Sequence, residues 1–358
     1  MYITWVIGNG FDIRCGLKTT YNHFYEWLEM NKRVGNNEIY RDIKEKGFDY
    51  WVDFEKRLGE YSKDLPYDKI GLFGKNLETL ITDLAEYLSS EEERIEKIQL
   101  GNIDSFFTSI TSFPTYLTPA DCQTLNVRDN FNRSGNPNVS SYVSYISLNY
   151  TNVFQKYWDT LKPGTLFIKE IGLSLDYRFR DGCNLHNTLQ TGMVLGCDNV
   201  NQCNQMSEIS NLLIKPIINS NTGGLNDDKS RRIISETDIF ILFGTSIGET
   251  DKTWWNLIAG QCLKNPKCRI IIFNYNNTFN RFNTHQTIRN RATVIGHFLS
   301  QLDNFDQEAI NTIQQRIIAS ENIVDMFQMN PKLKSINNSP EIMGRPRFNK
   351  SYDFSTSK

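Results

Sequence analysis

The chain has 358 residues, enough for one large α/β domain with insertions or for two modest domains. Its hydrophobic content of 39% and charged content of 22% are ordinary for a globular protein. The net charge is −2, from 39 basic and 41 acidic residues, which implies no global attraction to nucleic acid or anionic lipid. Nucleic acid is therefore not indicated as a partner.

The cysteines and the hydropathy pattern exclude several further classes. The seven cysteines include no C-x-x-C pair, and no histidine stands at ligand spacing from them. We therefore expect reduced thiols and no bound metal. No apolar run approaches membrane-spanning length, and a strand that starts at residue 2 leaves no room for a signal peptide. We expect a cytoplasmic protein without a membrane segment.

The chain opens on a strand, a glycine-rich turn and a helix. Residues 2–7 are β-prone and apolar, and residues 19–28 predict a helix capped by a threonine. Between them, Gly8 and Gly10 would let the backbone approach an anion. The turn is not the G-x-G-x-x-G dinucleotide fingerprint, because Ile13 stands where the third glycine belongs. We expect Gly10→Val to abolish nucleotide binding and to leave the fold intact.

Residues 25–140 predict several helices and no central strand. The clearest helix covers 76–98, where leucines recur on one face from Leu77 to Leu88. The run Glu91-Glu92-Glu93 is expected to lie in solvent. This segment is therefore interpreted as a helical insertion between two strands of one sheet.

From residue 142 the pattern changes to short apolar runs that alternate with helices. Such runs predict a mostly parallel sheet with both faces covered, which is a Rossmann-like α/β fold. We expect one domain over 1–330, with the helical insertion at about 25–140, and a flexible tail over 331–358. The predicted strands cover 142–148, 165–171, 184–187, 193–196, 239–243 and 269–273, and the predicted helices cover 153–161, a segment around Trp254-Trp255, and 306–319.

Small and polar residues follow four of the predicted strands. They are Gly8 and Gly10, then Asn149, then the Gly244-Thr245-Ser246 turn, and then Asn274. Because ligands of parallel sheets bind outside the carboxyl ends of the strands, we expect these four strand ends to form one crevice.

Four blocks of sequence, in this order, resemble the AbiH family of bacterial abortive-infection proteins. More distantly, the same blocks are similar to the sirtuin-like NAD-binding fold, over about 1–30 and 142–275. The resemblance implies an antiphage effector that stays silent until infection, with a phage-derived trigger among its partners. The blocks are Gly8-Asn9-Gly10-Phe11-Asp12 with Gly16-Leu17-x-Thr19-x-Tyr21, Trp51-Val52-Asp53-Phe54-Glu55, Ser147-Leu148-Asn149-Tyr150-Thr151, and Gly244-x-Ser246-x-Gly248-x-x-Asp251.

The sirtuin-like resemblance implies that NAD is the substrate or ligand. Asn149 and His186 match the catalytic Asn and His positions of sirtuin-like NAD hydrolases. NAD cleavage passes through an oxocarbenium-like ribose with a good leaving group, so the protein must mainly orient a water and stabilise the ribose. The implied nucleotide-binding residues are Gly8, Asn9, Gly10, Phe11, Asp12, Thr19, Tyr21, Gly244, Thr245, Ser246, Glu249, Asp251 and Asn274.

Several alternatives stay open. Asn187 replaces the glycine that usually follows the histidine, so His186 could be an ordinary loop residue, and Asp12 and Asp251 could simply cap helices. Zinc-ribbon cysteines are absent, which argues against protein deacetylation. The alternative functions are a nucleotide-binding sensor without catalysis, and a hydrolase or nuclease that acts on another nucleotide or on nucleic acid. We also expect a homo-oligomer.

Overall fold

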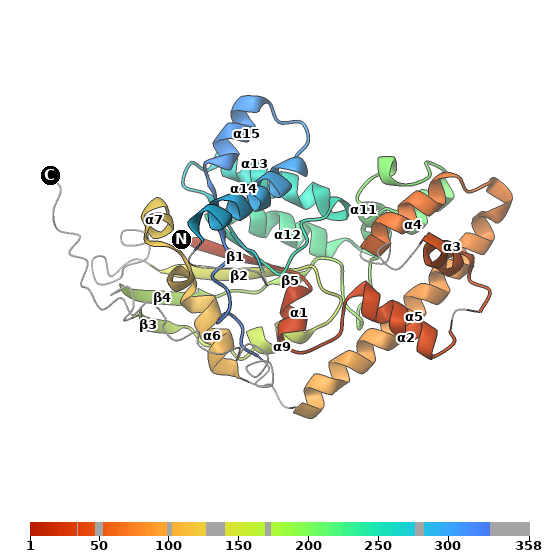
Figure 1. Ribbon diagram of the computed structural model, residues 1–358, viewed down its shortest axis with the longest axis horizontal. Helices are drawn as coiled ribbons and strands as arrows, with labels where there is room; N and C mark the ends of the chain where they lie inside the picture. The colour runs from red at the N-terminus through yellow and green to blue at the C-terminus, as the bar shows by residue number, and fades with distance from the viewer. Residues whose placement is uncertain are drawn as a thin grey trace.

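The computed structural model describes residues 1–33, 35–46, 53–98, 102–126, 140–168, 173–275 and 283–329. Its centre is an eight-stranded sheet in the order β3-β4-β2-β1-β6-β7-β8, with β5 also paired to β2 (Figure 1). All pairs are parallel except the antiparallel pair β3 and β4, so the Rossmann-like prediction is confirmed. The strands are β1 Tyr2–Ile7, β2 Ser141–Ser147, β3 Gly164–Ile168, β4 Leu173–Phe179, β5 Cys183–Asn184, β6 Ile239–Phe243, β7 Arg269–Phe273 and β8 Ile317–Ser320.

The order of the strands places a switch point at β1. From β1 the chain moves to β2 and β4 on one side, and then returns to β6, β7 and β8 on the other side. In doubly wound sheets a crevice forms at the carboxyl ends of the two strands where the order reverses. Here those strands are β1 and β6, which are followed by the Gly8 turn and the Gly244 turn.

The strands are apolar throughout because each sheet face packs against helices. In β1, Ile3, Trp5 and Ile7 belong to one core, and Val6 belongs to the core on the opposite face. Helices α6 and α9 cover the first face, and α12, α13, α14 and α15 cover the second. These helices span α6 Ile103–Thr111, α9 Val153–Trp158, α12 Leu225–Glu236, α13 Lys252–Lys264, α14 Thr284–Ser300 and α15 Gln307–Gln314.

The first part of the predicted insertion, up to α5, folds as a helical lobe with its own core, built around Phe24, Phe54 and Leu77 (Figure 1). The later part, from Phe106 to Leu125, packs in the core of the sheet instead. The described part of residues 25–140 contains helices and no strand. The expected threonine cap is Thr20, whose Oγ1 accepts from the N–H of His23 at 3.3 Å. The lobe comprises α2 Tyr21–Met30, α3 Glu38–Lys46, α4 Phe54–Lys63 and the long α5 Ile70–Ile98, and it packs against α10 Ser207–Leu213.

Three secondary-structure predictions were wrong in whole or in part. The strand expected over 184–187 ends at Asn184, the last residue of β5. Residues 193–196 form a loop, because Gly192 and Gly196 both have positive φ, at 89° and 152°. The late helix over 306–319 ends at Gln314, and β8 follows it directly. No glycine or proline separates β8 from α15, so the sequence contains no signal that a helix ends there and a strand begins. The predicted tail, 331–358, lies outside the described residues.

The expectation of a solvated glutamate run holds for Glu93, which is exposed, and is wrong for the other two glutamates. Glu91 and Glu92 lie within α5, and their residues are only 6% and 5% exposed. Glu91 Oε2 accepts from the N–H of Lys18 at 2.8 Å, and Glu92 Oε1 accepts from the N–H of Asn152. Both carboxylates therefore join the helical lobe to the sheet. Among the described helices, none combines the length and apolar character needed to cross a bilayer.

Candidate functional site

The turns after β1 and β6 pack directly against each other. A Cβ added to Gly10 would lie 2.5 Å from the Cα of Gly244, and one added to Gly8 would lie 2.5 Å from the Gly244 carbonyl oxygen. The N–H of Gly10 donates to that same carbonyl at 2.9 Å. Gly244 itself has a φ of 67°, which favours glycine. The glycines therefore allow two backbone segments to approach each other closely. The sequence pattern alone could not distinguish this role from the approach of the backbone to an anion.

This packing changes the outcome expected for substitutions at Gly10. A Cβ at 2.5 Å from backbone forces a shift, so Gly10→Val would disturb the fold and not only ligand binding. We expect Gly10→Ala to lower the free energy of unfolding by about 1–3 kcal/mol, measured by denaturant titration. Gly260→Ala is the matched control, because open space surrounds that helical glycine and alanine should stabilise it by up to about 1 kcal/mol. An unchanged unfolding midpoint for Gly10→Ala would contradict the close approach.

The same turns leave several backbone donors unused. The N–H groups of Asn9, Thr245 and Ser246 make no hydrogen bond to the described part of the chain. Thr19 orders Asn9, because its carbonyl accepts from Asn9 Nδ2 at 3.1 Å and its hydroxyl donates to Asn9 Oδ1. Unpaired amides at strand ends can bind an anion. The Phe11 side chain cannot contact a ligand, since it is fully buried in the aromatic core of the sheet.

Asp12 is a buried carboxyl group beside this pair of turns. Its Oδ1 accepts from Asn149 Nδ2 at 3.0 Å, and its Oδ2 accepts from the Thr151 hydroxyl at 2.6 Å. Asn149 Nδ2 also lies 3.2 Å from the Gly8 carbonyl oxygen, so it joins the ends of β1 and β2. Burial raises the pKa of Asp12 to about 7, although both hydrogen bonds lower it. A carboxyl group that titrates near neutral pH is typical of functional sites.

The raised pKa of Asp12 makes stability depend on pH. Between the ordinary value of 3.8 and about 7, the folded protein keeps a proton that the unfolded chain releases. Stability should therefore fall as pH rises through this window, by at most about 4 kcal/mol at 1.4 kcal/mol per pKa unit. Asp12→Asn should remove that loss, because an amide oxygen can accept from Asn149 and its NH₂ can donate to Thr151. Denaturant titrations of both proteins from pH 4 to pH 8 would contradict this if the two curves ran parallel.

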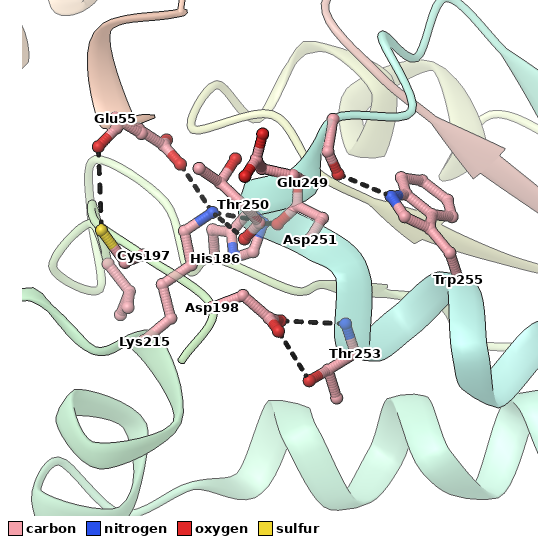
Figure 2. A network of polar contacts seen from close by, with 12 residues as sticks. Glu55, His186, Cys197, Asp198, Lys215, Glu249, Thr250, Asp251, Thr253 and Trp255 are labelled. Carbon is pink, nitrogen blue, oxygen red and sulfur yellow. Dashed lines mark hydrogen bonds and ion pairs between the residues drawn. The ribbon is translucent and has the colours of Figure 1, made fainter. Parts of the chain in front are cut away.

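A second buried polar cluster surrounds Lys215, at the start of α11 Lys215–Asn221 (Figure 2). Lys215 is 4% exposed, and its Nζ lies 2.6 Å from Glu55 Oε2 and 2.9 Å from Asp251 Oδ1. It also donates to the Thr250 carbonyl at 3.2 Å. Burial opposes the charge of Lys215, but the two carboxylates raise its pKa above the ordinary value. Burial likewise opposes the charge of Asp251, whose pKa is nevertheless lowered by Lys215 and by His186. The lysine and the aspartate are therefore both charged.

Two tyrosines complete the cluster at Glu55. The hydroxyls of Tyr21 and Tyr150 both donate to Glu55 Oε1, at 2.8 and 2.7 Å. Tyr21 belongs to the first sequence block, Glu55 to the second, Tyr150 to the third and Asp251 to the fourth. All four blocks thus contribute a side chain to one buried network.

His186 lies at the edge of this network. It is 3% exposed, and its Nε2 lies 2.7 Å from Asp251 Oδ1. Its position follows from the sheet: Ser147 of β2 pairs with Asn184 of β5, and Asn149 and His186 each lie two residues further along. The two side chains therefore reach the same edge of the sheet. They have different partners there, since Asn149 contacts Asp12 and His186 contacts Asp251.

A family model described as bacteriophage abortive infection AbiH matches residues 4–275. The chain belongs to the AbiH family. Membership in this family implies a role in bacteriophage abortive infection. The matched region contains both the strand-end turns and the Lys215 cluster. No curated protein matches the chain.

Asn187 of this AbiH protein stands where the sirtuin-like pattern has glycine, and its backbone explains why. Its φ is 58°, in the left-handed region that glycine adopts freely and asparagine tolerates best among other residues. Its side chain also fixes the loop, because Nδ2 donates to the Gly192 carbonyl at 3.1 Å and Oδ1 accepts from Asn226 at 2.8 Å. The change from glycine therefore keeps the backbone conformation that follows His186.

The loop from β6 to α13, which carries Asp251, is strained. Ile247 has a φ of 53°, unusual for a β-branched residue and of a kind that costs roughly 1–3 kcal/mol. The surroundings impose this conformation: Trp255 Nε1 donates to the Gly248 carbonyl at 2.9 Å, and Asp198 accepts from the N–H and the hydroxyl of Thr253, both at 3.0 Å (Figure 2). Strained backbone often accompanies functional sites, and here it sets the position of Asp251.

The side chains of the remaining sequence-predicted site residues lie outside both clusters. Glu249 points to the helical lobe, where its carboxylate pairs with Lys56 of α4 at 2.7 Å. Asn274 follows β7, and its N–H donates to the Ser320 carbonyl at 2.9 Å. Ser246 is exposed, and its carbonyl accepts from His297 Nε2 at 3.0 Å.

Sequence reasoning missed three members of the buried network, Glu55, Tyr150 and Lys215. The first two stand inside the quoted blocks, so their positions were available even though their roles were not. For Lys215 the signal was a lone lysine directly after the apolar run Leu212-Leu213-Ile214. Among the described residues, no group of three or more His, Cys, Asp or Glu side chains is arranged to hold a metal ion.

Proposed function

We propose that this AbiH protein is an antiphage effector that hydrolyses NAD⁺ to nicotinamide and ADP-ribose when infection triggers it. The observation that carries the proposal is the set of unpaired backbone amides at the switch point between β1 and β6. Unpaired amides of Asn9, Thr245 and Ser246 stand at this point, with the titratable carboxyl of Asp12 and the amide of Asn149 next to them. An anion-binding backbone beside a tunable carboxyl suits a dinucleotide substrate.

In the proposed reaction, the free amides hold the pyrophosphate and Asn149 lies near the nicotinamide ribose. The oxygen of a water forms a bond to the ribose C1′ while the bond from C1′ to the nicotinamide nitrogen breaks. Nicotinamide leaves as a neutral molecule, and the water proton passes to the Asp12 carboxylate, whose pKa of about 7 suits a general base. His186 contacts a ribose hydroxyl and supports the positive charge that develops on the sugar.

The proposed site is closed in this conformation. Asp12, Asn149 and His186 are 1%, 6% and 3% exposed, so a substrate reaches them only after the loops move. Closure supports an effector that stays silent in the uninfected cell. We propose that a phage-derived trigger opens the crevice, and that a homo-oligomer is the responding form.

The test follows NAD⁺ in infected cells and with purified protein. Cells that carry the protein should lose NAD⁺ and accumulate free nicotinamide after infection, and cells that carry Asp12→Ala should not. Purified protein incubated with NAD⁺ and infected-cell lysate should release nicotinamide, measured by chromatography. If the protein aborts infection while NAD⁺ stays constant, the hydrolase proposal fails.

One observation favours a second candidate function, a nucleotide sensor without catalysis. The Asn149 amide already donates to Asp12 and to the Gly8 carbonyl, which is a structural use that leaves no donor free. A sensor would bind NAD or a related nucleotide at the same crevice and couple its occupancy to assembly. Nucleotide binding without nicotinamide release, together with a change in oligomeric state, would favour this candidate.

A further inference from the structure

The long helix α5 runs from the helical lobe toward α9, and its later turns contact two loops at the edge of the sheet (Figure 1). In the loop before α2, the N–H of Lys18 donates to Glu91 Oε2 at 2.8 Å, and the Lys18 carbonyl accepts from the Tyr87 hydroxyl. In the loop after β2, the N–H of Asn152 donates to Glu92 Oε1. Tyr87, Glu91 and Glu92 are each at most 6% exposed. One helix of the lobe thus fixes the backbone of both loops.

Each fixed residue is the direct neighbour of a residue that orders the proposed site. After Lys18, Thr19 orders Asn9, whose N–H is one of the donors proposed to hold the pyrophosphate. Before the fixed residue of the second loop, Thr151 donates to Asp12 Oδ2 at 2.6 Å. Consecutive Cα atoms are only about 3.8 Å apart, so a displaced residue moves its neighbour. The three side chains of α5 therefore hold the anion-binding turn and the Asp12 carboxyl in place together.

The contact between α5 and the loops is close to energetic balance. Glu91 and Glu92 are consecutive buried carboxylates, so they repel each other and lose hydration. The backbone donors offset this cost, together with Arg94 Nη1 at 2.7 Å from Glu91 Oε1 and Lys156 Nζ at 3.5 Å from Glu92 Oε2. Release returns both carboxylates to water, which offsets the loss of these contacts. A partner with a modest preference for the released state can therefore shift the equilibrium.

We propose that Tyr87, Glu91 and Glu92 form a latch that keeps the site closed, and that release of this latch is the step by which a trigger opens it. The proposal rests on the proposed function, because it states how the same site is regulated. While the latch holds, the two loops stay against α5 and the carboxyl of Asp12 stays buried. After release, the loops separate from α5 and a nucleotide gains access to Asp12.

The first experiment measures opening without any nucleotide, by amide hydrogen exchange in the purified protein. The double variant Glu91→Ala, Glu92→Ala should raise exchange at least tenfold at the N–H groups of Leu17 and Leu189. These groups donate at 3.0 Å to backbone carbonyls, of Asp12 and of the second loop respectively, and not to a latch side chain. A rise therefore reports movement of the loops. Unchanged rates in the double variant would overturn the latch.

Two further variants keep this experiment decisive. Glu93→Ala is the matched control, because it makes the same change at the neighbouring exposed position of α5 and should leave both exchange rates unchanged. Tyr87→Phe removes only a hydroxyl, so it tests the latch even if the double variant does not fold. It should raise exchange at Leu17 about fivefold, the effect of one lost hydrogen bond. An unchanged rate at Leu17 in Tyr87→Phe would also overturn the latch.

The second experiment measures NAD⁺ in uninfected cells. The double variant should deplete NAD⁺ without infection, whereas wild type and Glu93→Ala should not. A purely structural role of the two glutamates predicts the opposite result, a loss of activity after infection. Adding Asp12→Ala to the double variant should abolish the depletion.

The two experiments separate failure of the latch from failure of the hydrolase. If wild type consumes NAD⁺ after infection and the folded double variant consumes none in uninfected cells, release of the latch is not the regulated step and the proposal is overturned. If no form consumes NAD⁺ under either condition, the hydrolase proposal fails, while raised exchange at Leu17 and Leu189 still supports the latch.

Discussion

Replacing Lys215 with methionine should lower the free energy of unfolding by about 3–5 kcal/mol, the usual effect of removing one partner from a buried ion pair. Lys215 is the cation between Glu55 and Asp251, at 2.6 and 2.9 Å, and all three side chains are at most 15% exposed. Without it two carboxylates remain buried with no compensating lysine. Denaturant titration at pH 7 measures the loss.

Lys56→Met is the matched control for this substitution. Lys56 pairs with Glu249 at the same short distance, 2.7 Å, but its side chain is 38% exposed. Exposed pairs contribute at most about 1 kcal/mol, so the control should change stability little. If both variants lost a similar free energy of unfolding, burial of the Lys215 network would not determine its contribution to stability.

Neutralising the carboxylates should recover part of the stability lost in Lys215→Met. The triple variant Lys215→Met, Glu55→Gln, Asp251→Asn leaves no uncompensated charge, and the amides can still accept from Tyr21, Tyr150 and other donors. Its stability should exceed that of Lys215→Met, because replacing a whole buried ionic cluster is much less unfavourable than breaking it. A triple variant no more stable than the single one would contradict this account of the network.

The sheet was largely predictable, because its strands have a strong local pattern. Residues 239–243 and 269–273 are apolar runs between polar turns, and both are strands with those same bounds. The parallel direction of the strands could be predicted because helices connect successive strands in the sequence. The short strand β8 was not predictable in this way, because Ile317 to Ser320 follows α15 without a glycine or proline.

The candidate site was predictable only where it depends on strand ends. Asn149 reaches the β1 turn because β1 and β2 are paired and parallel, which the sequence pattern indicates. The pairing of Lys215 with Glu55 joins positions 160 residues apart on two helices, and no local pattern encodes it. Gly10 and Gly244 are also far apart in the sequence. The two glycine turns could be predicted from the sequence, but the close contact between their backbones could not.

Asn149→Ala should reduce NAD⁺ turnover by about 10²-fold or more and abolish protection in infected cells, while much of the nucleotide affinity remains. The reason is that Asn149 would act on the ribose mainly in the transition state. His186→Ala should lose turnover similarly. Turnover is measured as nicotinamide released per folded molecule, because loss of the donor to Asp12 and Gly8 also destabilises the protein by about 1–3 kcal/mol. Asn31→Ala, which removes an exposed amide that bonds only to the Trp27 carbonyl, controls for a general effect of the substitution.

Thr151→Val separates a direct role of Asn149 from a role through Asp12. Thr151 donates to Asp12 Oδ2 at 2.6 Å, so valine removes the other hydrogen bond that lowers the pKa of Asp12 and leaves Asn149 in place. Both variants should move the pH dependence of turnover upward, because Asp12 then ionises at higher pH. Only Asn149→Ala should keep a large loss at pH 9, where the Asp12 carboxylate is restored. If Thr151→Val loses as much turnover as Asn149→Ala at every pH, Asn149 acts by positioning Asp12 and not on the substrate.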